Sequence, residues 1–116
     1  MTNIVKSKIY IMSKFGEKIR ELRESNNLLL RELASEIKID QALLSKIERG
    51  DRIATKKQAL LIADFFNVNR EEFLSQWLGE KIAYELKDEE LASEALKVAE
   101  EELEYYKKTK KETNHV

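Results

Sequence analysis

The apolar residues of this chain recur at intervals of three and four positions, in short segments separated by turn-prone residues. The first segment carries Phe15, Ile19 and Leu22 and ends at Asn26–Asn27. Such intervals place side chains on one face of a helix, whereas a half-buried strand alternates apolar and polar residues. The chain has no proline and only three glycines, so it lacks the turn signals of an all-β protein. The pattern predicts an all-α bundle of short helices.

The boundaries of these helices are indicated by capping residues. Ser13 precedes the first helix, and the second is predicted over about Leu30–Ile37. The third is predicted over Gln41–Arg49, with Asp40 as its N-terminal cap and Gly50 as the left-handed residue that ends it. Pairs with the spacing of a capping box open the fourth and fifth helices: Thr55 with Gln58, and Asn69 with Glu72.

The apolar positions of the second to fifth helices define the rest of the expected core. They share the periodicity of one helix face, so their side chains should meet in a common interior. Trp77 and Phe73 are assigned to this core, or to a hinge between it and the chain that follows. The inward residues are Leu33, Ala34, Ile37, Leu44, Ile47, Ala59, Ile62, Ala63, Phe66, Phe73, Leu74, Trp77 and Leu78.

After the fifth helix, Gly79 is predicted to break the chain, and a long acidic helical stretch follows to about Lys108. Five residues of this stretch recur at spacings of 4, 3, 4 and 3, which is a heptad-like seam. The seam has three interpretations: it folds back on the preceding domain, pairs with the same helix of a second copy, or holds a different protein. The seam residues are Ala92, Leu96, Ala99, Leu103 and Tyr106.

The predicted organisation has four parts. Residues 1–12 are an N-terminal extension, 13–78 a compact helical domain, 79–108 a helical dimerisation extension and 109–116 a frayed tail. The first 11 residues are either an extension upstream of a natural start or a short additional element, since Ile9–Met12 is apolar.

Charge divides unevenly along the chain, although its net charge is only −1. Residues 1–60 carry 13 basic and 8 acidic side chains, a net charge of +5, and the remainder carries 8 basic and 14 acidic side chains, a net charge of −6. A basic front half with an acidic back half suggests an anion-binding module followed by a solvated helical extension. Chance asymmetry on exposed helix faces would give the same distribution.

Residue usage excludes several function classes. Without cysteine the chain has no disulfide, thiolate nucleophile or cysteine zinc site. It also has no glycine pattern for phosphates or dinucleotides, so we expect no enzyme, cofactor or metal site. Glu100–Glu102 and Glu104 are interpreted as a solvated face, and the only histidine, His115, lies in the tail. No apolar run is long enough to span a membrane and no signal-peptide pattern is present, so we expect a cytoplasmic protein. No small-molecule pocket is evident.

The most informative stretch runs from Leu30 to Gly50. Two short helices joined by three or four residues set the second helix at a steep angle to the first. Ala34 allows the two helices to approach closely, and Ile39 in the turn fills the corner between them. The second helix of the pair then presents outward a face that fits the major groove of B-DNA: Gln41, Ala42, Ser45, Lys46 and Arg49.

This stretch resembles the Cro/repressor (Xre-type) helix-turn-helix family, and the likeness covers roughly Phe15–Leu74. Four fragments carry the resemblance, in order and at the family spacing: Ile19–Arg23, Glu32–Ala34, Ser45–Gly50 and Ile62–Val68. The resemblance implies a five-helix, lambda-repressor-like helix-turn-helix bundle over 13–78 with a C-terminal helical extension. It also implies binding to double-stranded DNA.

Family positions imply roles for individual residues. The start of the third helix reads bases in the family, where glutamine can bond adenine and an alanine methyl can pack on thymine. Ser45 and Arg49 suit contact with either bases or the DNA backbone, and Glu48 holds a structural position in which it pairs with Arg20 or Arg23. The implied base contacts are Gln41, Ala42, Leu43, Ser45 and Lys46, and the implied backbone contacts are Lys38, Arg49, Arg52 and Lys56.

Three features depart from the family pattern. Leu29 and Leu30 stand where members often have a Ser or Thr cap and a phosphate-contacting Gln, and losing the cap costs about 0.5–2 kcal/mol. Lys38 stands in a turn that often holds glycine, where a positive φ costs about 1 kcal/mol. Leu43 faces outward, where it either contacts thymine methyls or joins Leu29 and Leu30 in a protein interface.

The function implied by the resemblance is sequence-specific regulation of transcription. Most members of the family repress, and helix-turn-helix proteins commonly bind palindromic sites as dimers, so we expect a homodimer and a repressor. Small members of this size resemble controllers of restriction–modification genes and regulators of mobile elements. The alternative is an antitoxin or a protein-interaction adaptor that uses the acidic C-terminal helix.

Overall fold

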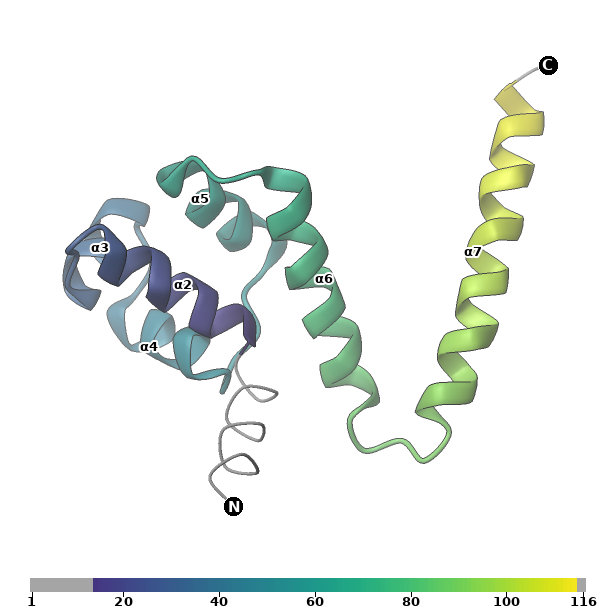
Figure 1. Cartoon of the computed structure of the whole chain (residues 1–116), viewed down its shortest axis with the longest axis horizontal. Coiled ribbons are helices and arrows are strands. Elements are labelled where there is room, and N and C mark those ends of the chain that lie inside the picture. Colours follow the sequence, from purple (N-terminus) through teal and green to yellow (C-terminus); the bar gives the residue numbers. More distant parts are fainter. Residues whose placement is uncertain (1–13, 115–116) are drawn as a thin grey trace. The chain divides into compact units, whose positions relative to one another are not determined.

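The computed structural model of the chain describes residues 14–114, with side chains to residue 110 (Figure 1). Every element that it describes is an α-helix, which confirms the all-α fold. The predicted extension over 1–12 and the predicted cap Ser13 lie outside the described residues. The helices are α2 (Lys14–Ser25), α3 (Leu30–Ile37), α4 (Gln41–Arg49), α5 (Lys56–Phe66), α6 (Arg70–Leu86) and α7 (Ala92–Asn114).

The chain divides into two compact units, with the boundary after Ile82. The first unit contains α2–α5 and most of α6, and the second contains α7 and the end of α6. In the first unit α2 packs on α4, and α3 packs on both α4 and α5 (Figure 1). The buried apolar side chains are Phe15, Ile19, Leu33, Ala34, Ile37, Ile39, Leu44, Ile47, Ala54, Ala59, Ile62, Ala63, Phe73 and Trp77.

Three residues predicted to face the core lie at its margin or outside it. Phe66 and Leu74 are half-buried and pack against the core cluster. Leu78, however, is 48% exposed, so its assignment to the core was wrong. The physical reason is that α6 continues past the core after Trp77, which leaves the following turn of the helix without an apolar surface to cover it.

Capping contacts fix the helix ends at the predicted residues. The Asp40 carboxylate accepts a hydrogen bond from the Leu43 N–H at 3.1 Å, and Gly50 ends α4 with φ of 80°. Thr55 and Gln58 exchange side chain–backbone hydrogen bonds of 2.9 and 3.1 Å. The Asn69 side chain likewise accepts from the N–H of the residue three positions later, at 3.0 Å. These bonds satisfy backbone donors that the first turn of a helix leaves unpaired.

Three contacts hold α6 to the rest of the first unit. The Trp77 indole N–H donates to the Ala54 carbonyl at 2.6 Å, and the rings of Phe15 and Phe73 lie 4.9 Å apart. The half-buried Glu80 carboxylate accepts a hydrogen bond from the Phe15 backbone N–H at the start of α2. Burial raises the pKa of the Glu80 carboxyl, and the hydrogen bond partly opposes this shift.

The C-terminal part of the chain differs from the prediction at two positions. Gly79 does not end a helix, because α6 continues through it to Leu86. Glycine inside a helix costs about 1 kcal/mol, which favourable neighbours can offset. The tail predicted to fray from residue 109 remains helical to Asn114. The Thr109 hydroxyl donates to the Tyr105 carbonyl at 2.9 Å within this last part of α7.

Candidate nucleic-acid interface

The turn between α3 and α4 has the geometry that sets two helices at a steep angle. Lys38 adopts φ of 56° and ψ of 45°, the left-handed conformation expected at this position of the turn. The N–H groups of Lys38 and Ile39 donate to the carbonyls of Ser35 and Ala34, at 3.4 and 3.0 Å. Ile39 and Ala34 are buried, so the predicted corner residue and close-approach residue both lie in the interior. The Lys38 side chain is exposed.

Helix α4 separates its side chains into an inward and an outward set. Leu44, Ile47 and Glu48 are buried. Leu43 is half-buried and packs against the core cluster, so less of its side chain faces outward than the sequence suggested. Ser45 is also half-buried. The exposed residues of α4 are Gln41, Ala42, Lys46 and Arg49.

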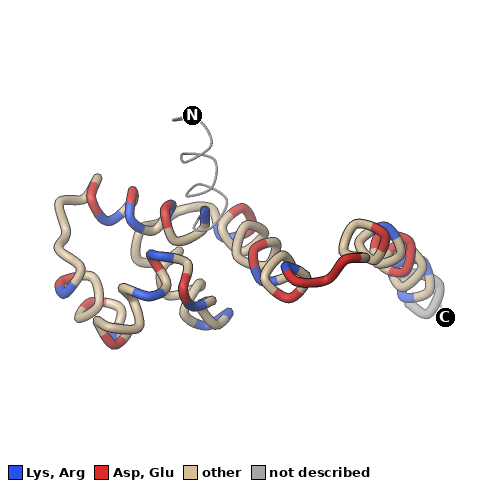
Figure 2. The backbone as a smooth tube through the Cα atoms, turned by 90° about the horizontal axis from the view of Figure 1, so that it is seen from below, with Lys and Arg blue, Asp and Glu red and all other residues tan. Residues whose placement is uncertain are grey.

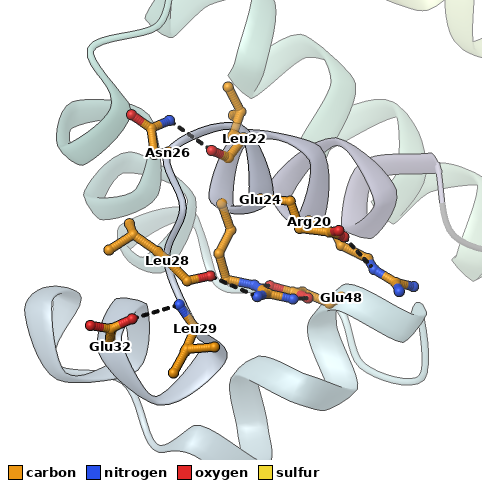
Figure 3. Close-up of polar contacts among 9 residues, drawn as sticks. Arg20, Leu22, Glu24, Asn26, Leu28, Leu29, Glu32 and Glu48 are labelled. Atoms are coloured by element: carbon orange, nitrogen blue, oxygen red, sulfur yellow. Dashed lines mark hydrogen bonds and ion pairs between the residues drawn. The ribbon is translucent and has the colours of Figure 1, made fainter.

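A largely buried ion pair joins α4 to α2 and shows which of the two arginines considered for Glu48 is its partner (Figure 3). The Arg23 Nε and Nη2 groups donate to the two Glu48 carboxylate oxygens, at 2.8 and 3.0 Å. The third nitrogen, Nη1, donates to the Leu28 carbonyl at 2.9 Å. The exposed Arg20 pairs with Glu24 instead, at 2.8 Å. The hydrogen bonds that the Arg23 guanidinium donates to the Glu48 carboxylate raise the pKa of Arg23. One guanidinium therefore ties α2, the loop before α3, and α4 together.

The start of α3 shows how the missing cap is partly replaced. Leu29 holds the N-cap position and is 51% exposed, and its side chain makes no cap hydrogen bond. The Glu32 carboxylate reaches back and accepts from the Leu29 N–H at 2.8 Å (Figure 3). Half of a capping box therefore remains. Leu30, the next residue, is half-buried and packs against the core cluster.

Comparison with protein-family models matches residues 19–73 to the family described as helix-turn-helix. This match confirms the resemblance of the segment to the Cro/C1-type, Xre-like helix-turn-helix family. The helix-turn-helix domain identifies the chain as a DNA-binding protein that regulates transcription. The match begins within α2 and ends within α6, and so includes both α3 and α4. No curated protein that was compared with the chain matches it.

One residue of the helix-turn-helix domain matters for its geometry and was missed in the sequence. Gly16 in α2 is buried where α2 crosses the end of α4. A Cβ atom built there would meet the carbonyl oxygens of Ile47 and Glu48 and lie 2.7 Å from the Glu48 carbonyl carbon. Glycine is therefore required for this approach of α2 to α4. No sequence signal marked this role, because only the crossing of α2 with α4 makes the position crowded.

Basic residues lie on α4 and on the segments that flank it in the chain. Figure 2 shows Lys and Arg interspersed with Asp and Glu over the helices of this domain, and an acidic segment after α6. Lys38, Arg52 and Lys56, the predicted backbone contacts outside α4, are all exposed. Arg49 is also exposed and forms an ion pair of 3.2 Å with Asp51. Such exposed pairs contribute little to stability, so a phosphate can replace the carboxylate.

Neither a metal-binding cluster nor a membrane-spanning helix is found among the described residues. Within residues 14–114, no three His, Asp or Glu side chains come together as a metal ion would require. In the same part of the chain, no helix combines the length and apolar character needed to cross a membrane.

Proposed function

We propose that this DNA-binding protein is a sequence-specific repressor that occupies a palindromic operator as a homodimer. The observation that carries the proposal is the division of α4, which anchors Leu44 and Ile47 in the core and leaves Gln41, Ala42 and Lys46 exposed. An α-helix presented in this way fits the major groove, where Gln can bond adenine and Lys can bond guanine. Lys38, Arg49, Arg52 and Lys56 would contact the backbone and fix the register.

Selection from a pool of random duplexes tests sequence specificity. The wild-type protein should enrich one short, near-palindromic sequence. The double variant Gln41→Ala, Lys46→Ala should lose that preference, because each good base contact contributes about 1–3 kcal/mol of discrimination. Lys97→Ala removes one positive charge from α7 and serves as the control, with the preference retained. Equal enrichment of all sequences by the wild-type protein would refute the proposal.

The homodimer part of the proposal is supported by the exposure of α7. All side chains from Ser93 to Lys110 are exposed, and those of Leu96, Leu103 and Tyr106 are 44%, 57% and 61% exposed. With Ala92 and Ala99 these residues recur at the spacing of a two-stranded coiled coil. A second copy would cover the seam, and the two recognition helices of such a dimer would need to lie about 34–36 Å apart, one turn of DNA, to occupy both half-sites.

The mass in solution tests this pairing. The wild-type protein should be a dimer, and Leu96→Glu, Leu103→Glu should be a monomer that binds the selected duplex weakly. Glu101→Gln, on the opposite side of the same helix, should remain dimeric. The exposed seam also suits a protein of another kind, as in an antitoxin or adaptor. A monomeric wild-type protein would favour that second function.

A further inference from the structure

A hollow lies on the surface of the helix-turn-helix domain where α2 and α4 meet. Its volume is about 400 Å³ and it is open to solvent. Three residues of α2 and three of α4 contribute most of its polar groups. They are Glu17, Arg20, Arg23, Ser45, Glu48 and Arg49.

The five charged side chains of the hollow are the paired Arg23 and Glu48, the exposed Arg20 and Arg49, and the half-buried Glu17. Arg23 and Glu48 neutralise each other in two short hydrogen bonds, and their side chains are only 14% and 7% exposed. The side chains of Arg20 and Arg49 are 64% and 61% exposed. Outside the neutral pair, the two arginines outnumber the one carboxylate of Glu17, so the hollow attracts an anion.

Each exposed arginine has an interaction that an incoming anion can displace. Arg20 contacts Glu24 at 2.8 Å, and Arg49 contacts its partner Asp51 at 3.2 Å; both carboxylates are more than half exposed. Ion pairs of this kind contribute about 0–1 kcal/mol, since both groups remain well solvated when apart. The guanidinium group presents paired donors that match the oxygens of a phosphate.

The position of the hollow identifies the anion. Ser45 and Arg49 belong to the same helix as the exposed Gln41 and Lys46, so the hollow adjoins the face proposed to enter the major groove. A duplex that accommodates α4 brings the phosphates bordering that groove against the flank of the helix.

We propose that the hollow binds one backbone phosphate of the DNA, with Arg20 and Arg49 as its charged donors and the Ser45 hydroxyl as a third donor. This inference rests on the proposed function and adds Arg20 to the DNA-contacting residues. It gives Ser45 a backbone contact and no role in reading bases.

The charge of Glu17 should have the opposite effect on DNA binding to that of Arg20. The Glu17 carboxylate lines the same hollow and repels a phosphate placed there. Removing this charge should therefore strengthen DNA binding, whereas removing the Arg20 charge should weaken it. A purely structural role for the hollow would give no such pair of opposite effects.

The experiment measures binding to two duplexes, the selected one and a scrambled one of equal length, over 50–200 mM salt. Arg20→Ala should weaken binding to both about eightfold per subunit at 0.1 M salt, and the slope of log K against log salt should fall by about 0.9 per subunit. Glu17→Gln should strengthen binding to both. Lys18→Ala removes an equal charge from a residue of α2 that does not line the hollow, and it should have a much smaller effect. Glu24→Gln releases Arg20 from its ion pair and should not weaken binding.

Equal effects of Arg20→Ala and Lys18→Ala would overturn the inference, as would weaker binding by Glu17→Gln. Circular dichroism of each variant verifies the fold. If the proposed function is wrong, the protein will show no preference for the selected duplex over the scrambled one, which differs from the two outcomes above. The scrambled duplex still reports on the phosphate contact in that case.

Discussion

The two compact units of this chain treat their apolar side chains in opposite ways. The first unit buries Leu33, Leu44 and Ile62 completely around a common core. The second carries α7, a helix of 23 residues whose described side chains from Ser93 to Lys110 are all exposed. Stability in the first unit therefore comes from contacts within one molecule. An isolated helix obtains little stability in water without packing, so the second unit depends on what covers it.

This comparison has a measurable consequence. Substitutions in the first unit should change the free energy of unfolding by the same amount at every protein concentration. Substitutions in the seam of α7 should have effects that grow with concentration, because association stabilises only the paired state. Substitutions in the first unit test the first of these expectations, and they are ordered from the largest effect to the smallest.

The largest effect is expected for Arg23→Ala. The substitution leaves the Glu48 carboxylate buried and without its partner, and breaking a buried pair in this way costs about 3–5 kcal/mol. Urea denaturation measures the loss. The matched control is Arg20→Ala, which breaks an exposed pair and should cost about 0.5 kcal/mol. The double variant Arg23→Met, Glu48→Leu should be more stable than Arg23→Ala. Equal stability of the two single variants would show that the pair does not hold α2 to α4.

Gly16→Ala should have the next largest effect. The added Cβ would meet the backbone at the end of α4, which cannot give way as a side chain can. Overpacking of a close contact costs about 1–3 kcal/mol. The same urea titration measures the change, and it should not depend on protein concentration. An unchanged urea midpoint would mean that α2 can move away from α4 with no loss of stability.

The sequence specified the local structure of the first unit better than its long-range contacts. The limits of α4 were predictable because Asp40 and Gly50 act on the backbone next to them. The choice between Arg20 and Arg23 was not, because the two lie three residues apart on one helix and only the crossing with α4 separates them. The role of Gly16 gave no signal for the same reason.

Further along the chain, the predictions for Gly79 and Leu78 were wrong, because each relied on a local sequence preference that the rest of the structure overrides. Gly79 is unfavourable in a helix, but the helix-compatible residues on both sides continue α6 to Leu86. Leu78 fitted the periodicity of a core residue, yet periodicity cannot show where the core ends. The candidate DNA contacts of α4 were predictable as an outward face, except that Leu43 and Ser45 are half-buried.

A smaller effect, of opposite sign, is expected for Gly79→Ala. No atom outside the helix lies within 4 Å of the added Cβ, so the methyl group meets open space. Alanine should stabilise α6 by up to about 1 kcal/mol, because it restricts the unfolded chain more than glycine does. A thermal melt should therefore show a higher midpoint for this variant and a lower one for Gly16→Ala. A lower midpoint for both would contradict the assignment of Gly79 to a regular, exposed part of α6.

The smallest effect is a pH dependence that depends on Glu80, where α6 meets the start of α2. Burial raises the pKa of this carboxyl in the folded state, so folding favours its protonated form. The associated stability is fully present below the ordinary pKa of 4.5 and is lost as the pH rises through the folded value. Glu80→Gln keeps an oxygen that accepts from the Phe15 N–H but carries no charge.

The variant should therefore be more stable than the wild type at pH 7, and the difference should shrink towards pH 4. Urea titrations at the two pH values measure this, with Glu85→Gln on an exposed part of α6 as the control for lost charge. Glu80→Ala should be less stable than Glu80→Gln at both pH values, because it also removes the acceptor. If Glu80→Gln were instead destabilising at pH 7, the ionised carboxylate would be strengthening the contact between α6 and α2. Its hydrogen bond to Phe15 would then outweigh the cost of burial.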